Sequence, residues 1–435
     1  MVQAVRNAFS LPDLRRKLLI TLGILIIYRL ASHVPVPGVD TEVLKSALGG
    51  ESGVGQLVNI LDLLSGGAVS NFSVMAMGVY PYVTASIIFT LLTPIIPQLE
   101  ALSQEGEAGR NKLNQYQYYL TIPLAALQAI GQIRILESGA QGGQPIIQGF
   151  GLTNLTGITT IVTMTAGTMF AIWLGELITE EGVGNGLSVI IFGGIVSRMP
   201  SNVRTTYDQD GFVGLVILLA IMIVTLFVIV VVQEGQRRIP VQYGKRVRGR
   251  KIYGGQATHI PLRVNTAGMI PLIFAQSILT FPSIVASFFA NPAGEQKNLA
   301  NHISNLFGMQ SNWYWPMYFL MVVAFTYFYT DVMVQQQNLP ESLRKQGGFI
   351  PGIRPGKRTA DYINGVMRRI TLVGALFLGG VAVLPGVVGI IRGTSGSSTM
   401  LIGSTGLLIV VGVVIDTMRQ LEAQLLMRHY EGFIK

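Results

Sequence analysis

Long apolar stretches recur along the chain, and shorter polar segments separate them. An α-helix needs roughly 20 apolar residues to cross the hydrocarbon core of a bilayer, which is about 30 Å thick. The pattern therefore predicts an all-α membrane protein with ten membrane-spanning helices. The predicted spans are approximately residues 18–34, 74–92, 116–133, 155–178, 186–199, 212–232, 268–289, 313–334, 370–391 and 400–418.

One apolar stretch, from Leu57 to Leu64, is too short to span. Eight helical residues extend about 12 Å, less than half of the hydrocarbon thickness. The side chains that share one helical face are Leu57, Ile60, Leu61 and Leu64. The residues that follow, Ser65, Gly66 and Gly67, can form a hinge because glycine adopts many backbone conformations. From the residues alone, an external amphipathic helix lying on lipid is one interpretation, and the role of the stretch stays open.

Composition supports the membrane prediction and removes several site types. Half of the residues are hydrophobic, 12% are charged, and the mean hydropathy is +0.50. Cysteine is absent, which excludes disulfides, thiolate metal ligands and cysteine nucleophiles. The basic start, residues 1–17, resembles a signal peptide, but no small-residue cleavage site follows the first apolar run. We therefore expect a retained first helix after a short N-terminal segment.

Positive charge predicts the orientation in the membrane. Most of the 31 Lys and Arg residues lie in five segments, and cytosolic loops carry such an excess. An even number of spans places both termini on this cytosolic side. The basic segments are residues 1–17, the loop with Arg110 and Lys112, the loops 233–263 and 335–369, and the tail 419–435.

Two of these loops are long as well as basic. A topology signal that contacts anionic lipid explains the charge but requires no length. Embedded isoleucine, proline, tyrosine and phenylalanine residues instead suit the docking of an acidic or nucleic-acid-bearing partner. Glycines and prolines around Arg354 predict a tight, exposed tip. The candidate docking residues are Arg237, Arg238, Lys245, Arg246, Arg248, Arg354, Lys357 and Arg358.

Ionisable residues are rare inside the predicted spans and lie mostly near their ends. This argues against an ion-coupled transporter, which commits charged groups near the midplane. The four histidines show no metal-ligand spacing, so no metal or other cofactor is predicted. The glycines of "GVGNGLS" from Gly182 indicate the start of a helix rather than a phosphate cradle. No paired polar catalytic groups are visible at depth, so we expect no enzyme, whereas a small-solute uniporter or secondary transporter stays open as the alternative.

Uncharged polar residues within spans are the next candidates. Thr84, Gln128 and Asn265 can form hydrogen bonds between helices, each contributing about 1 kcal/mol, either as structural contacts or as contacts that open. Pro81 and Pro271 are expected to interrupt helical hydrogen bonds and permit bending, as is Pro282.

Several motifs, in matching order and spacing over essentially the whole chain, resemble those of the SecY/Sec61-alpha family of protein-conducting channels. They are "RLASHVPVPGVD", "LDLLSGGAVSNFSVMAMGVYPYVTASII", "AGTMFAIWLGELITEEGVGNGLS", "QRRIPVQYGKR", "NTAGMIPLIFA", "GGFIPGIRPGKRTADYI" and "LLIVVGVVIDTM". The resemblance implies ten helices in two pseudo-symmetric five-helix halves, residues 18–199 and 200–418, around an hourglass pore. It implies a channel that translocates secretory polypeptides across, and laterally inserts membrane proteins into, the bacterial plasma (inner) membrane.

The resemblance also implies roles for particular residues. Residues 56–68, with the apolar face and hinge described above, become a plug that blocks the resting pore. A ring of aliphatic side chains, which would seal against ions yet yield to a polypeptide, comprises Val79, Val83, Leu187, Ile191, Ile273 and Ile409. Without the resemblance, each would be ordinary apolar packing. Thr84, Gln128 and Asn265 match the polar contacts of a lateral gate between the second and seventh spans.

The resemblance further implies the partners. These are the SecE and SecG subunits, the SecA motor ATPase, the ribosome, signal sequences with their nascent polypeptides, and the lipid bilayer. Arg238 and Arg354 are the residues expected to matter most for docking SecA and the ribosome. The chain itself has no nucleotide-binding motif, so ATP hydrolysis is expected from the partner.

Overall fold

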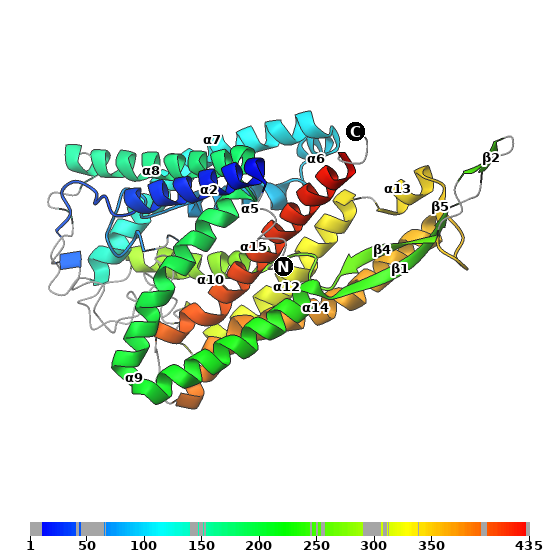
Figure 1. Ribbon diagram of the computed structural model, residues 1–435. Helices are drawn as coiled ribbons and strands as arrows, with labels where there is room; N and C mark the ends of the chain where they lie inside the picture. Colours follow the sequence, from blue (N-terminus) through cyan, green and yellow to red (C-terminus); the bar gives the residue numbers. More distant parts are fainter. Residues whose placement is uncertain are drawn as a thin grey trace.

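The computed structural model is a helical body from which a small β-sheet arm extends (Figure 1). The structure describes residues 11–40, 43–44, 65, 67–139, 147, 151, 154–243, 246–248, 251–253, 257–289, 306–307, 311, 313–337, 339–392 and 398–431. Its helices are α2 (Pro12–Ala31), α5 (Tyr80–Leu92), α6 (Pro97–Gln104), α7 (Glu107–Gly139), α8 (Leu155–Glu181), α9 (Gly186–Glu234), α10 (Ile270–Phe289), α12 (Tyr314–Gln337), α13 (Leu339–Lys345), α14 (Lys357–Arg392) and α15 (Ser398–Glu431).

Neighbouring helices pack in an order that groups the chain into two sides. On the N-terminal side, α7 packs against α5 and α8, and α8 packs against α2 and α9. On the C-terminal side, α12 packs against α10 and α14, while α15 packs against α9 and α14. Helix α10 also touches α7, which connects the two sides.

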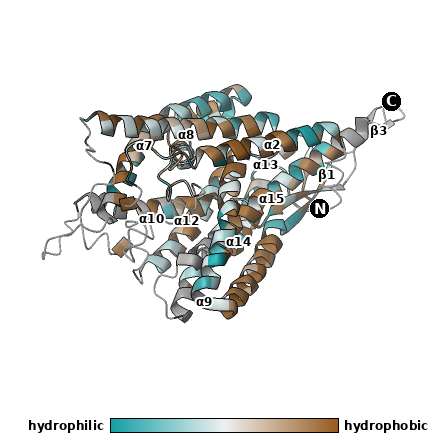
Figure 2. Ribbon diagram, turned by 60° about the vertical axis from the view of Figure 1, so that its left-hand side comes forward, coloured by the Kyte–Doolittle hydropathy of each residue, from teal (hydrophilic) through white to brown (hydrophobic). Residues whose placement is uncertain are grey.

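Several helices have the character of membrane spans. Among the residues that the structure describes, four segments are long and apolar enough to cross a bilayer by length and composition, and these are Leu155–Glu181, Gly211–Glu234, Tyr314–Lys345 and Lys357–Val387. Helices α5 and α6, bent by 101° at their junction, make a fifth if each bent pair counts as one span. Brown, hydrophobic ribbon predominates along the helices in Figure 2, most uniformly on the second limb of α9. The protein is therefore a multi-pass membrane protein, and the full set of ten spans stays a prediction.

Helix α5 begins later than the apolar run that predicted it. The run starts at Val74, but residues 67–79 form irregular turns with positive φ at Gly67, Phe72 and Gly78. Pro81 lies in the first turn of α5, where a missing N–H breaks no helical hydrogen bond.

The expected bending at Pro81 is therefore wrong. The same holds for Pro271, the second residue of α10, whereas Pro282 does lie inside that helix. A proline within the first turn begins a helix rather than bending it.

The fifth and sixth apolar runs lie on two helical limbs that meet at a kink at Gly211, with no loop between them. Helix α9 continues from Gly186 to Glu234, and only Gly211 leaves helical geometry, with φ 67° and ψ −166°. Figure 1 shows the two limbs of α9 meeting at a sharp bend. At its start, the Asn185 side chain accepts a hydrogen bond from the Ser188 amide at 3.2 Å, which confirms the predicted helix start in "GVGNGLS".

Both long basic loops fold into one β-sheet, which the all-α prediction missed. Strands β1 (Gln236–Tyr243) and β4 (Ala257–Arg263) pair antiparallel, and β5 (Gly348–Phe349) from the second loop pairs with the other edge of β1. Strands β2 (Arg246–Arg248) and β3 (Lys251–Tyr253) form a separate two-stranded ladder. We refer to residues 236–263 and 339–356 together as the arm.

The arm has its own small core. Along β1, Ile239 and Val241 are buried while the residues beside them are exposed, as expected for a strand that covers apolar side chains on one face. The side chains packed with them are Leu262, Val334, Leu343, Ile350, Ile363 and Met367. The core therefore joins the strands to the ends of α12, α13 and α14.

Candidate functional site

The six predicted ring positions lie in two apolar clusters. Val79, Ile191 and Ile409 are buried in a cluster that brings the start of α5 against α8, α9 and α15, with Leu187 partly buried beside it. Ile273 belongs to a second cluster with Ile87 and Phe274, against which Val83 packs.

The two clusters meet on α5. The Val83 amide donates a hydrogen bond to the Val79 carbonyl at 3.1 Å, so the two valines lie one helical turn apart. Aliphatic side chains from both sides of the molecule thus converge on the first turn of α5. Such a contact offers an ion no replacement for its hydration shell, although aliphatic side chains can move around a larger passenger.

The segment that precedes α5 is held at several points. Most of the predicted plug, including Leu57, Ile60, Leu61, Leu64 and Gly66, lies outside the described residues. The predicted hinge is represented by Ser65 and Gly67. We refer to residues 65–70, in their described part, as the hinge segment.

Two distant helices contact this hinge segment. The Tyr28 hydroxyl of α2 donates a hydrogen bond to the Ser65 carbonyl at 3.3 Å. From α9, the Arg198 guanidinium donates to the Ser70 hydroxyl at 2.5 Å, and that hydroxyl in turn donates to the Gly67 carbonyl at 3.0 Å. Gly67 has φ +96°, and a Cβ at this position would lie 2.9 Å from Arg198 Nε. Glycine is therefore required there both by the backbone and by the arginine.

After the hinge segment, the chain presses closely on α8. A Cβ built on Gly167 would lie 1.9 Å from the Val74 carbonyl oxygen, far inside any permitted contact. Ala68, Val69 and Phe72 are fully buried in the neighbouring clusters. The irregular backbone between the hinge segment and α5 is thus closely packed against its neighbours.

The predicted gate residues are partly brought together. Gln128 Nε2 of α7 donates a hydrogen bond to the Thr84 hydroxyl of α5 at 3.3 Å, as a contact between those spans requires. Asn265 is buried but bonds within its own turn, because its side chain accepts from the Gly268 amide at 3.0 Å and donates to the Gly268 carbonyl at 3.1 Å. Among the described residues, Asn265 is not hydrogen-bonded to Thr84 or Gln128.

Helix α7 also carries two buried amide oxygens that find no partner in the described part of the chain. They are Oε1 of Gln128 and Oε1 of Gln132, one turn apart. A buried acceptor left without a hydrogen bond costs about 1–3 kcal/mol. The two glutamine side-chain oxygens of α7 can therefore still accept hydrogen bonds in the interior.

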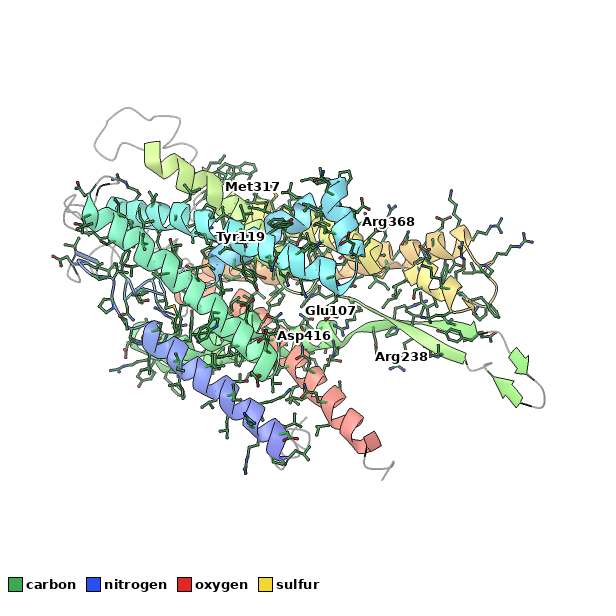
Figure 3. All side chains as sticks on the ribbon, turned by 90° about the horizontal axis from the view of Figure 1, so that it is seen from above. Glu107, Tyr119, Arg238, Met317, Arg368 and Asp416 are labelled. Carbon is green, nitrogen blue, oxygen red and sulfur yellow. The ribbon has the colours of Figure 1, made fainter. Side chains whose placement is uncertain are left out.

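The structure describes some of the predicted docking residues and not others. Arg237 and Arg238 on β1 are exposed, and so are Arg354 in the turn before α14 and Lys357 and Arg358 at the start of α14. Figure 3 shows Arg238 along the arm. Lys245 and the side chains of Arg246 and Arg248 lie outside the described residues.

The Arg354 turn is built as the sequence predicted. Gly352 and Gly356 on either side have φ of +81° and +112°, values that favour glycine. The Thr359 hydroxyl donates to the Arg354 carbonyl at 3.0 Å, which holds the backbone while the Arg354 side chain stays exposed.

One polar cluster within the helical body was not predicted from the sequence. The Tyr118 hydroxyl of α7 donates a hydrogen bond to Glu176 of α8. Tyr82 of α5 stacks on Tyr118 with ring centroids 5.4 Å apart, and its hydroxyl donates to Gln117 Oε1 at 3.2 Å. Glu176 is a charged residue inside an apolar run, and that signal could have indicated a partner, though not which one.

Comparisons with known proteins agree on one family. The family model described as SecY matches residues 73–418. The chain is 42% identical over 444 residues to the protein translocase subunit SecY of Streptomyces coelicolor, and the match covers 100% of both chains.

Two solved structures share the fold. One, from work on the plug domain of a SecY protein and its closed channel, has a TM-score of 0.58 at 17% identity. The other, Sec61 in the canine ribosome-channel complex, has a TM-score of 0.56 at 18% identity. Each match covers 94% of this chain and 92% of the other.

Proposed function

The chain belongs to the SecY family, and from this membership we propose a protein-conducting channel that moves secretory polypeptides across a bacterial inner membrane and inserts membrane proteins laterally into it. The small-solute transporter that the sequence left open is set aside, because a relative aligned over its whole length is a protein translocase subunit. The family is one of translocation channels, and we propose that this chain has no catalytic activity of its own.

One observation supports the proposal: a single short segment, residues 65–87, contains in order the contacts that three functions of a channel would need. It provides the hinge segment at Ser65, the aliphatic contacts at Val79 and Val83, and the gate contacts at Thr84 and Ile87. A movement of this segment would therefore act on plug, ring and gate together.

We propose ten spans in two pseudo-symmetric halves, with the ring residues at the narrowest point between them. Residues 56–68 would form the plug, whose hinge segment Tyr28 and Arg198 hold. A translocating polypeptide would displace the plug and press apart side chains such as Ile191 and Ile273. Aliphatic contacts suit this role because they have no fixed direction and re-form behind the passenger.

Lateral release would open the contact between α5 and α10. A signal helix presents an apolar face to this contact and shifts the equilibrium by binding the open state more tightly than the closed one. The contact between the gate helices is made by Ile87, Ile273 and Phe274, and Gln128 with Thr84 braces α5 against α7. Asn265 would act by holding the turn from which α10 begins.

The arm would dock cytosolic partners, the SecA motor and the ribosome, and both chain termini would lie on that side. Exposed arginines on a small rigid sheet support this part, because they can meet acidic protein or ribosomal RNA. SecE and SecG are the membrane subunits that we expect to complete the channel.

The test places a single cysteine in a chain that naturally has none. Ile273→Cys or Ile191→Cys should crosslink to a stalled secretory chain in reconstituted membranes, provided the signal sequence is functional. Val224→Cys, on the exposed face of α9, is the matched control and should not crosslink. Absence of crosslinking at both ring positions in folded, partner-bound protein would overturn the proposal.

A charge reversal tests the docking function separately. Arg354→Glu should abolish motor-driven export because it places a like charge against an acidic partner surface, while the fold stays intact. Arg344→Glu on α13 reverses an exposed arginine of the same arm and serves as control. Normal motor-driven export in the Arg354 variant would contradict this role.

A further inference from the structure

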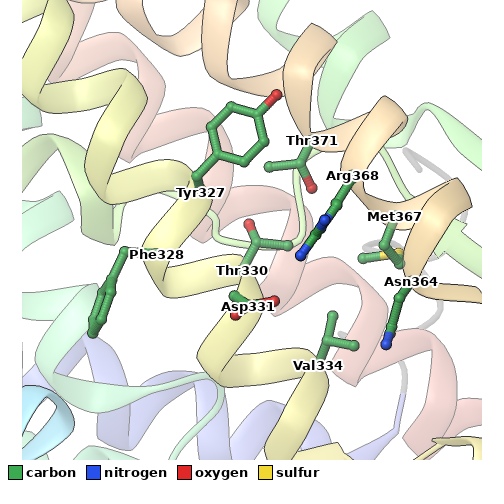
Figure 4. Close-up of a pocket in the computed structure, with 9 residues that line it drawn as sticks. All are labelled: Tyr327, Phe328, Thr330, Asp331, Val334, Asn364, Met367, Arg368 and Thr371. Carbon is green, nitrogen blue, oxygen red and sulfur yellow. The ribbon is translucent and has the colours of Figure 1, made fainter. Parts of the chain in front are cut away.

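A cavity lies between α12 and α14, near the base of the arm and apart from the ring and gate (Figure 4). Its volume is about 390 Å³, within the range that small-ligand pockets of proteins occupy. Asp331 and Thr330 of α12 line it, together with Arg368 and Thr371 of α14. In Figure 4 the Arg368 side chain extends toward Thr330 and Asp331 across the opening. One pocket therefore combines a carboxylate, a guanidinium and two hydroxyls.

The cavity lies where both helices change from apolar to charged. Asp331 is the first charged residue after the apolar run of α12, and Arg368 with Arg369 directly precedes the apolar run of α14. In a membrane protein, this change marks the level of the lipid headgroups. The polar pocket is therefore at the depth where phosphate and amine groups of lipid are found.

The two hydroxyls in the pocket differ from other threonines of the same helices. Thr326, one turn before Thr330, donates a hydrogen bond to the Val322 carbonyl at 2.6 Å. For Thr330 and Thr371, both nearly buried, the described part of the chain shows no such side-chain bond. Both threonines line the cavity. Both hydroxyls can therefore serve a ligand.

Exposed apolar side chains continue from the pocket along both helices. On α12, Leu320 and Phe328 lie 11 and 3 positions from Asp331, spacings that place all three on one face. On α14, Leu372 and Leu376 lie 4 and 8 positions after Arg368 and share its face. A polar pocket thus opens onto an apolar lane that leads toward the membrane interior.

We propose that this pocket binds the phosphoethanolamine headgroup of a bilayer phospholipid, with its acyl chains along the apolar lane. The Arg368 guanidinium would bind the phosphate, for which its planar donors are suited. The Asp331 carboxylate would accept hydrogen bonds from the ammonium, and Thr330 and Thr371 would complete the contacts.

The charges of the pocket select among lipids. A phosphatidylglycerol headgroup has no cation for Asp331 and sets its phosphate near that carboxylate. A phosphatidylcholine headgroup carries a cation whose methyl groups cannot donate a hydrogen bond to a carboxylate. Ethanolamine supplies both the charge and the donors, so the pocket should prefer it over either of the other two headgroups.

The inference concerns lipid binding and does not depend on polypeptide transport. Helices α12 and α14 carry the arm, and Val334 and Met367 belong both to the pocket lining and to the arm core. A lipid bound here would make the packing at the base of the arm depend on the lipid composition of the membrane.

The test measures lipid retention by the full-length protein. The protein is reconstituted in nanodiscs of equal parts phosphatidylethanolamine, phosphatidylglycerol and phosphatidylcholine, released into detergent, and examined by native mass spectrometry. Asp331→Asn should lower retention of phosphatidylethanolamine about fivefold while leaving phosphatidylglycerol unchanged, as expected for loss of one ion pair. Arg368→Gln should lower retention of all three phospholipids.

Matched controls are Arg369→Gln and Asp361→Asn, which change exposed charges of α14 outside the pocket and should change nothing. Three results would overturn the proposal. They are a preference of the wild-type protein for phosphatidylglycerol, equal phosphatidylethanolamine retention in wild type and Asp331→Asn, and retention lowered equally by the control variants.

Discussion

Arg198 of α9 and Ser70 of the hinge segment are joined by a hydrogen bond of 2.5 Å between the guanidinium Nη2 and the hydroxyl oxygen. The two residues are 128 positions apart in the chain. Because a donor in this bond is charged, it contributes about 1.5–3 kcal/mol, roughly twice a neutral hydrogen bond. The contact ties the segment that would release the plug to the fifth predicted span.

Arg198→Ala should therefore raise the resting ion conductance of the reconstituted channel. Loss of about 1.4 kcal/mol from the closed state increases the open population roughly tenfold. The measurement is the current across a planar bilayer without any translocating substrate. Arg204→Ala, whose exposed arginine contacts Asp208 at 3.9 Å, is the control and should leave the current unchanged. Equal currents in the Arg198 variant and wild type would show that the bond does not hold the plug.

Gly167→Ala should destabilise the protein by about 1–3 kcal/mol, as overpacking of a filled interior does. The added methyl group would meet the Val74 carbonyl oxygen at 1.9 Å, and backbone cannot rotate aside as a side chain can. Gly380→Ala on α14, where nothing lies within 4 Å of the new Cβ, is the control. Thermal midpoints in detergent compare the two, and equal midpoints would contradict the close approach.

Gln132→Met should raise the thermal midpoint. The substitution removes a buried amide whose oxygen has no partner in the described part of the chain, and methionine nearly matches its volume. Gln117→Met should have the opposite effect, because Gln117 accepts the Tyr82 hydroxyl at 3.2 Å. A lower midpoint for the Gln132 variant would reveal a partner that the described residues do not supply.

Thr84→Val should relax the selectivity for signal sequences. It removes the acceptor of the Gln128 amide and costs α5 a contact of about 0.6–1 kcal/mol, enough for a several-fold rise in export of substrates with defective signals. Asn265→Leu should act in the same direction by releasing the turn before α10. Unchanged selectivity in both variants would refute the gate assignment. A response only to Asn265→Leu would show that the turn before α10, and not the bond between Thr84 and Gln128, determines the selectivity.

A cysteine pair tests whether the two basic loops act as one body. Gln242 and Phe349 are directly paired on β1 and β5, so Gln242→Cys with Phe349→Cys brings two cysteines to a distance that a disulfide can bridge. Oxidation should leave motor-driven export unchanged, because the strands are already paired. Each single variant is the control for the effect of the substitution itself. Export lost on oxidation and regained on reduction would show that the loops must separate.

Apolar periodicity predicted where helices run but not where they begin. The apolar run toward α5 starts at Val74, yet the positive φ at Gly78 and the proline at position 81 set the first helical turn at Tyr80. Proline is informative once its position is known, because the same residue starts one helix and bends another. Hydropathy alone cannot tell the two apart, since Val74 to Val79 are as apolar as the helix that follows.

The sequence contains a signal for strand β1 of the arm but none for strand β5. Ile239, Val241 and Tyr243 alternate with Arg238, Pro240 and Gln242, a period of two in the large apolar side chains that is typical of a strand. Strand β5 has only two residues, and it becomes a strand because β1 lies beside it. The sequence could thus have predicted β1, whereas β5 required the fold.

The candidate site was predictable by residue type and not by contact. Thr84 and Gln128 were expected together and are hydrogen-bonded, while Asn265 was expected with them and bonds Gly268. Arg198 is a charged residue near the end of the fifth predicted span, but nothing in the sequence near Ser70 indicates that the two residues are partners. Contacts between distant segments depend on packing that one sequence does not display.

The pairing of β1 with β5 gives the molecule a mechanical property. The arm core includes Val334 of α12 and Met367 of α14, so a force on the exposed arginines passes through the sheet into both helices. Both helices belong to the second predicted half of the chain. A partner that pushes on the arm would therefore move α12 and α14 together rather than one at a time.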